Sequence, residues 1–201
     1  MLKPIDFYFD FSSPYGYLGS TRINALATAH GRSVHWHPIL LGAIFKAVGN
    51  APIMEIALKA RYSWHDLART ARFHEIPFQR PPHFPLSTQA AARAMLWIQD
   101  HYGHPMAVRF AHAVYAAMFV QGVDISAVAQ VLRIADVLGI DSATLAVALE
   151  TPEIKEALKM EVAQAIERGV FGAPFIIVDD EAFWGFDRFT QLAAFLKNGS
   201  I

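Results

Sequence analysis

Hydrophobic and polar positions change their period twice near the start of the chain. Residues 5–11 alternate and are rich in aromatic side chains, which predicts a strand buried on one face. From Pro14 to Gly31 the apolar residues recur at helical spacing, and Ser13 is suited to cap this helix. A second strand follows at residues 33–41. Strand, helix and strand in so short a segment predict a right-handed βαβ unit with parallel strands.

Helical patterning fills the middle of the chain, from about residue 42 to residue 168. Each helical segment is bounded by Gly, Pro or a residue that can cap a helix. The one interruption, "IPFQRPPHFPLS", contains four prolines and predicts an extended loop. The expected helix starts in this region are Ser126, Asp141 or Ser142, and Thr151.

Strand patterning returns at the C-terminal end. "APFIIVDD" and "AFWG" predict two strands joined by a reversal at residues 179–181, and Asp187 is expected to cap a closing helix. The element order is βαβ, a helical block and ββα, which predicts an α/β fold with a thioredoxin-like mixed sheet interrupted by an all-helical insertion. An open doubly wound sheet fits less well, because the middle of the chain offers no strand to extend it.

The same order predicts two domains. Residues 1–41 and 169–201 would form the thioredoxin-like domain, and residues 42–168 the helical insertion domain. The length of 201 residues fits one domain that carries a large insertion. Hydrophobic residues make up 54% of the chain, so we expect some of this excess to line a pocket or a subunit interface.

Charge and cysteine content exclude several classes of function. The 17 Lys and Arg balance 18 Asp and Glu without a run of one sign, so no nucleic-acid partner is expected. The chain has no cysteine, and any sulfur chemistry would therefore need a borrowed thiol. No apolar run is long enough to span a membrane, and the N-terminus lacks the pattern of a signal peptide. These features predict a cytoplasmic or organellar protein with no membrane partner.

The junction at Ser13 is the first candidate for chemistry. A helix N-terminus presents unpaired N–H groups and a partial positive charge, both of which favour an anion. Ser13 therefore either caps the helix alone or also lies at the mouth of an anion site. A role as acyl-transfer nucleophile is not favoured, because the chain has no Gly-x-Ser-x-Gly turn around this serine.

A second candidate lies in "GAPF", where Pro174 begins a strand. In a thioredoxin-like arrangement a cis proline at this place faces the helix N-terminus, and it exposes backbone groups of Ala173 to an extended, peptide-like ligand.

Among the nine histidines are two close pairs. His35 and His37 share one face of a strand, and His101 and His104 are three residues apart. No carboxylate accompanies either pair at the spacing of the zinc motifs, so no metal site is predicted.

Three motifs in order resemble those of one family. They are "DFYFDFSSPYGYLGS", "LGAIFKAVGN", and "IERGVFGAPFIIV" followed by "AFWGFDR". They are similar to the motifs of the thioredoxin-like, DsbA-type family that contains 2-hydroxychromene-2-carboxylate isomerases and kappa-class glutathione transferases. The resemblance covers nearly the whole chain.

The resemblance implies that glutathione is the cofactor and supplies the borrowed thiol. The family's catalytic serine maps onto Ser13, directly before Pro14, whereas Ser12 is one position too early. Ser13 would donate a hydrogen bond to the thiolate and would not attack. Further implied glutathione contacts map onto Ala173, Trp184, Gly185, Phe186 and Asp187. Phe186 departs from the Asn or Ser often found at its position.

The resemblance also implies a small aromatic carboxylate as substrate. The reaction would interconvert 2-hydroxychromene-2-carboxylate and trans-o-hydroxybenzylidenepyruvate in aromatic catabolism, by reversible addition of the glutathione thiolate. Implied substrate contacts map onto Lys46, Asn50, His83 and Phe84. An apolar wall is expected from the aromatic residues Tyr15, Tyr17, Phe45, Tyr62, Trp64 and Phe84.

Two alternatives stay open at this point. The first is a kappa-class-like glutathione transferase or peroxidase that acts on other electrophiles. The second is a non-catalytic thioredoxin-like binding module, in which Ser13 only caps the helix. The resemblance and the apolar excess further imply a homodimer, and the cytoplasm is the expected location.

Overall fold

The fold is seen in a computed structural model that describes residues 2–49, 52, 54 and 56–201. The described residues form one mixed sheet with the strand order β2-β1-β3-β4. Strand β1 (Ile5–Phe9) pairs in parallel with β2 (Val34–Pro38) and antiparallel with β3 (Phe175–Val178). Strand β3 pairs antiparallel with β4 (Glu181–Trp184). The predicted mixed sheet, built from a βαβ half and a ββα half, is confirmed.

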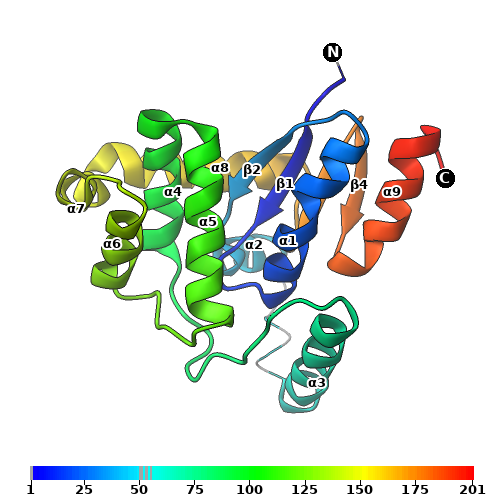
Figure 1. The fold of residues 1–201 in the computed structure, drawn as a ribbon, viewed down its shortest axis with the longest axis horizontal. Coiled ribbons are helices and arrows are strands. Elements are labelled where there is room, and N and C mark those ends of the chain that lie inside the picture. Colours follow the sequence, from blue (N-terminus) through cyan, green and yellow to red (C-terminus); the bar gives the residue numbers. More distant parts are fainter. Residues whose placement is uncertain (1, 50–51, 53, 55) are drawn as a thin grey trace.

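Helices pack on both faces of this sheet. Figure 1 shows α1 in front of the sheet and α8 behind it, with α4 to α7 gathered beside β2 and α3 at the lower right. The helices and their bounds are α1 (Pro14–Ala29), α2 (Leu41–Val48), α3 (Ala57–Phe73), α4 (Gln89–Tyr102), α5 (His104–Phe119), α6 (Val128–Val137), α7 (Ser142–Glu150), α8 (Pro152–Glu167) and α9 (Phe189–Asn198), with a 3-10 turn η2 (Phe186–Arg188) before α9. No helix of the described part is both long enough and apolar enough to cross a membrane.

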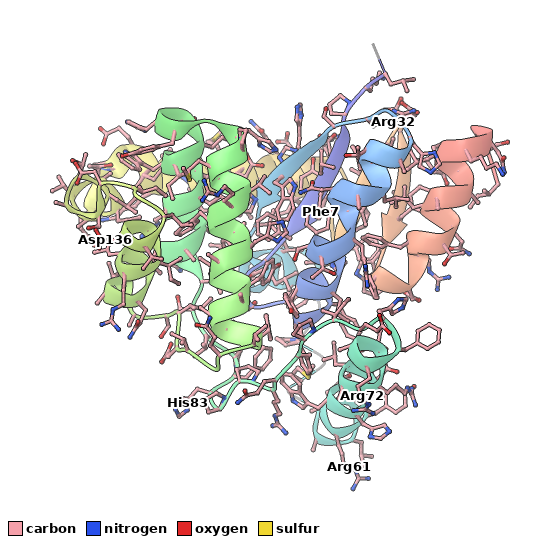
Figure 2. All side chains as sticks on the ribbon, in the orientation of Figure 1. Phe7, Arg32, Arg61, Arg72, His83 and Asp136 are labelled. Carbon is pink, nitrogen blue, oxygen red and sulfur yellow. The ribbon has the colours of Figure 1, made fainter. Side chains whose placement is uncertain are left out.

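Strand β1 is buried on both faces, whereas its sequence pattern predicted one buried face. Phe7 and Phe9 lie in the larger apolar cluster with residues of α1 and α5, and Figure 2 shows Phe7 near the centre of the view. Tyr8 points to the opposite face, where it packs in a second cluster with Leu158 of α8. The prediction failed because β1 became a central strand, and helices cover both faces of such a strand.

Three of the predicted helix caps are confirmed. Ser13 is the N-cap of α1 and accepts from the Gly16 N–H. Asp141, one of the two alternatives, caps α7, and Thr151 caps α8. Each side-chain oxygen takes up an N–H group that the first helical turn leaves unpaired.

Two other predicted helix starts were wrong. The N–H and hydroxyl of Ser126 both donate to Asp124 in a local turn, and α6 begins only at Val128. Asp187 does not cap α9, because the chain leaves β4 through Gly185 (φ 107°) and first makes the turn η2. That turn buries Phe186, and α9 then starts at Phe189 without a side-chain cap.

The β3–β4 connection is the predicted reversal, but the turn is one residue shorter than predicted. Asp179 and Asp180 both have positive φ (50° and 67°), as the two central residues of a type I′ hairpin turn require, while Glu181 already belongs to β4. Arg32 pairs with Asp179 and so ties the turn to the segment before β2. The division into a thioredoxin-like domain and a helical insertion domain stays a prediction.

Candidate active site

The turn between β1 and α1 is held rigidly from within. The Ser13 N–H donates to the Asp10 carbonyl oxygen (2.8 Å), and the Gly16 N–H donates to Ser13 Oγ (2.9 Å). The buried hydroxyl of Tyr115 on α5 donates to the same Asp10 carbonyl (2.9 Å). Ser13 itself is only 4% exposed, so its hydroxyl has a fixed set of neighbours.

One hydrogen bond joins this turn to the other half of the sheet. Ser13 Oγ donates to the carbonyl oxygen of Ala173 at 2.9 Å. The Ala173–Pro174 peptide bond is cis, as expected for this position. The hydroxyl of Ser13 therefore accepts from Gly16 and donates to Ala173. A thiolate could receive this proton only after the hydroxyl turns away from Ala173.

Glycines allow the closest approaches around this turn. A Cβ at Gly16 would lie 2.7 Å from the Tyr115 hydroxyl oxygen, and a Cβ at Gly172 would lie 2.3 Å from Trp184 Nε1. Both separations are well below van der Waals contact. Gly16 thus lets α1 reach the Tyr115 hydroxyl, and Gly172 lets the Trp184 indole lie against the backbone just before Ala173.

The first turn of α1 offers one backbone donor to a ligand. Pro14 has no N–H, while the N–H groups of Gly16 and Tyr17 are taken by the Ser13 side chain and carbonyl. The Tyr15 N–H has no acceptor among the described residues, as is usual for a helix N-terminus. Together with the helix dipole, this group suits an anion.

Asp10 fixes the segments that surround the turn. Its carboxylate accepts from the Ser12 N–H (2.8 Å), from the Leu41 N–H at the start of α2 (2.7 Å) and from the Thr88 hydroxyl before α4 (2.8 Å). Burial raises the pKa of Asp10, and the three hydrogen bonds act in the opposite direction. One carboxylate thereby links the N-terminal ends of three helices.

A cavity of about 1340 Å³ opens over this turn. Its wall is mostly apolar. The residues that line it come from the β1–α1 turn, α2, α3, the proline-rich loop and the C-terminal motif. They include Asp10, Ser12, Ser13, Tyr15, Phe45, Asp66, Arg69, Phe84, Thr88, Ala173, Trp184, Gly185, Phe186, Asp187 and Arg188.

The sequence prediction missed the polar face of α3 in this cavity. Tyr15 donates to Asp66 (3.0 Å), and Arg69 donates to the same carboxylate (2.5 Å) and to the Tyr62 hydroxyl (2.9 Å). Burial and then the bond to Asp66 raise the pKa of the Tyr15 phenol. The spacing of Tyr62, Asp66, Arg69 and Phe73, four, three and four residues, puts them on one helix face and was the signal available in the sequence.

The structure brings most of the predicted site residues together. Ser13 and all five predicted glutathione contacts line the cavity, as does Phe84 of the predicted substrate set. Lys46 and His83 are exposed and do not line it, and Figure 2 shows His83 at the lower edge of the molecule, pointing outward. Asn50 lies outside the described residues. The ligand roles of all these residues stay predictions.

The predicted aromatic wall is only partly correct. Tyr15, Phe45 and Phe84 line the cavity. Tyr17 is instead a core residue, whose hydroxyl donates to the Pro77 carbonyl (2.5 Å). Tyr62 is largely exposed beside Arg69, and Trp64 packs behind Phe84 with its ring centroid 5.0 Å away. Neither residue lines the cavity: Tyr62 shares a face of α3 with Asp66 and Arg69 but lies one turn closer to the exposed N-terminal end of the helix, and Trp64 lies on a different face.

Comparisons with known proteins agree with this architecture. The model of the DSBA-like thioredoxin domain family matches residues 4–197. A 2-hydroxychromene-2-carboxylate isomerase from Sphingobium xenophagum is 33% identical over 198 residues, which cover 98% of this chain and 99% of that protein. Glutathione S-transferase kappa 1 from Caenorhabditis elegans is 28% identical, over 98% of this chain and 92% of that protein. A solved structure of a 2-hydroxychromene-2-carboxylate isomerase matches with a TM-score of 0.87 and 27% identity, over 96% of this chain and 94% of that chain.

Proposed function

This chain belongs to the DSBA-like thioredoxin domain family, and on that premise we propose that it is a glutathione-dependent isomerase of a small aromatic carboxylate. The reaction is the interconversion of 2-hydroxychromene-2-carboxylate and trans-o-hydroxybenzylidenepyruvate. The named isomerases that match over almost the entire chain support this choice.

The observation that carries the proposal is the contact between Ser13 and Ala173 at the floor of the cavity. It joins the N-terminus of helix α1 to the cis-proline segment, and each of these two segments carries backbone groups that suit glutathione. The Tyr15 N–H suits the thiolate, and the backbone of Ala173 before the cis proline suits the peptide part. A cavity of about 1340 Å³ has room for glutathione and an aromatic substrate together. The residues present therefore fit this cofactor.

Bound glutathione would supply a thiolate that adds reversibly to a conjugated double bond, so that the bond can rotate. The chain has to hold the sulfur as an anion, since a free thiol with a pKa of about 8.5 is mostly protonated at neutral pH. The N-terminus of α1 contributes the backbone N–H of Tyr15 and the positive end of the helix dipole. Ser13 contributes a hydroxyl that can donate its hydrogen bond to the sulfur in place of the Ala173 carbonyl. A charge-assisted bond of this kind is worth about 1.5–3 kcal/mol.

Arg69 and Arg188 supply positive charge at the cavity for the substrate carboxylate or a glutathione carboxylate. Each also pairs with a neighbouring aspartate, Asp66 or Asp187. The apolar lining excludes water from the aromatic part of the substrate. Substrate roles for Lys46, Asn50 and His83 remain part of the proposal. Lys46 and His83 do not line the cavity, so they would contact only a ligand that extends beyond it.

The proposal is tested by mixing the purified chain with a hydroxychromene carboxylate and following the absorbance with and without glutathione. We expect a glutathione-dependent change, and a rate about 10–100-fold lower in Ser13→Ala because the charge-assisted bond is lost. Thr21→Ala is the matched control: it removes a hydroxyl from the same helix, where Thr21 Oγ1 donates only to the Leu18 carbonyl. The assignment is wrong if the reaction does not depend on glutathione.

The kappa-class relative supports a second candidate, a glutathione transferase or peroxidase that acts on other electrophiles. The two enzymes differ in their products, because isomerisation returns glutathione unchanged while conjugation or peroxide reduction consumes it. Measuring free thiol during turnover separates them. A chain that binds no glutathione by calorimetry, and in which Ser13→Ala alters stability alone, would be the non-catalytic binding module. A cytoplasmic homodimer is part of the same proposal, and sedimentation of the purified chain tests the dimer.

A further inference from the structure

A cluster of metal-ligand side chains lies on the sheet face that α8 covers, apart from the cavity. Strand register places Asp6 on β1 directly beside His35 on β2, and His37 follows on the same face. Asp6 Oδ1 lies 3.1 Å from His37 Nε2 and 3.8 Å from His35 Nδ1. None of the three residues lines the cavity. The carboxylate that the His35–His37 pair lacked in the sequence thus comes from the neighbouring strand.

We propose that Asp6, His35 and His37 bind a divalent transition-metal ion such as Zn²⁺. Two imidazoles and one carboxylate are a donor set that this ion accepts, with solvent in the remaining position. One donor atom from each residue lies within 4.8 Å of the other two. Bonds of about 2.0–2.2 Å in a tetrahedral site require ligand atoms about 3.4 Å apart, so small rotations of the side chains complete the site.

Partners in α8 and at its C-terminal end orient two of the three ligands. His37 Nδ1 lies 2.6 Å from Glu161 Oε1, which leaves Nε2 to face Asp6. Arg168 holds Asp6 Oδ2 at 2.8 Å, which leaves Oδ1 beside the imidazoles. Such carboxylate and cation partners fix ring and carboxylate orientation in metal sites. Once His37 gives up its proton, the carboxylates of Asp6 and Glu161 and the charge of Arg168 leave one net negative charge, which favours a cation.

His35 gives the ion access from solvent. Its side chain is 58% exposed, while those of Asp6 and His37 are mostly covered. His37 is therefore the covered ligand with a fixed orientation, and His35 is the ligand that solvent can reach. His35 can also be replaced without disturbing the packing, which makes it the residue to change in a test.

The test is calorimetric titration of the full-length, tag-free, chelator-treated chain with zinc sulfate at about pH 8. Imidazole binds metal only in its neutral form, and although burial acts in the opposite direction, the hydrogen bonds to Asp6 and Glu161 raise the pKa of His37 to about 9. The ion therefore displaces one proton from His37 to the buffer at this pH, and a basic pH keeps the cost of that displacement small. We expect one ion per chain, an affinity at least ten-fold weaker in His35→Asn, and no change in the control His65→Asn, which alters an exposed histidine of α3. Absence of binding, or equal loss in both variants, would overturn the proposal.

A second measurement separates a built site from a chance pair of histidines. Cobalt(II) replaces zinc and reports its ligands through its visible absorption, and Glu161→Gln is compared with the unchanged chain. Loss of a partner that orients a histidine ligand typically weakens metal binding about 10–100-fold. An unchanged cobalt spectrum and affinity in Glu161→Gln would contradict the proposed orientation of His37. Far-ultraviolet circular dichroism of the metal-free variants checks that each is folded.

Discussion

The two ends of strand β1 hold carboxylates in opposite surroundings. Asp10, at the cavity end, is 3% exposed, and its carboxylate accepts hydrogen bonds from three neutral groups of the described residues. Asp6, at the other end, has a side chain that is 19% exposed and lies among Arg168, His35 and His37. A buried carboxylate with fixed backbone donors holds loops in place, whereas a partly exposed one among charges can exchange its partners.

Replacing Asp10 should show the largest effect. In Asp10→Ala the N–H groups of Ser12 and Leu41 and the Thr88 hydroxyl lose their acceptor inside the protein. We expect the free energy of unfolding to fall by about 3–5 kcal/mol, measured by urea denaturation. Asp6→Asn, the counterpart at the other end, should cost about 1 kcal/mol because solvent and neighbouring charges compensate. Equal costs would contradict the contrast between the two ends.

A methyl group added at the cavity end should show the next largest effect. In Gly16→Ala the new Cβ meets the buried Tyr115 hydroxyl, which also holds the Asp10 carbonyl. Overpacking of this kind costs about 1–3 kcal/mol, and thermal unfolding measures it. Gly42→Ala is the control, since nothing lies within 4 Å of its Cβ and alanine favours the helix there. A Gly16→Ala protein as stable as the control would show that the turn is not rigid.

Removing the Ser13 hydroxyl should cost less in stability than replacing Asp10. Ser13→Ala loses an N-cap and the bond to Ala173, so the free energy of unfolding should fall by about 1–2 kcal/mol. Thermal unfolding of Thr21→Ala provides the reference for loss of a hydroxyl in α1. A loss as large as that of Asp10→Ala would mean that Ser13, and not Asp10, is the main support of the turn.

The smallest effect on stability should come from His112, which lies near the middle of β1, between its two ends. His112 is partly buried and packs edge-on against the core residue Trp36, and burial lowers its pKa below the usual 6.5. The folded state thus favours the neutral ring, so this contribution to stability is present above pH 6.5 and is lost as pH falls through the lowered pKa. His112→Gln should flatten the loss of stability between about pH 7 and pH 5, and His65→Asn should not. An unchanged pH profile in His112→Gln would contradict the shift.

The features that could be predicted from sequence are those set by local chemistry. Ser13 before Pro14 and Thr151 before Pro152 were recognised as caps, because capping depends on a few consecutive residues. The family motifs also marked the residues at the cavity floor. Asp187 was misassigned because a local cap pattern was overridden by the burial of Phe186.

The features that were missed depend on register and on packing between distant segments. Asp6 reaches the histidines only because β1 and β2 pair with one particular alignment. The Tyr15–Asp66 contact requires α3 to return against α1, which the helical pattern of α3 alone does not specify. A single sequence gives the faces of an element but not which other element each face meets.

The position of β3 also sets the order in which the site can be made during synthesis. Strand β3 pairs with β1 although most of the sequence lies between the two strands, and Ala173 follows Ser13, whose hydroxyl donates to it, by 160 residues. At about 5–20 residues per second, a ribosome needs roughly 8–32 s to cover that interval. Throughout this time one edge of β1 lacks its final partner, so the newly made N-terminal segment is exposed to strand pairing with other chains until its own C-terminal strands emerge.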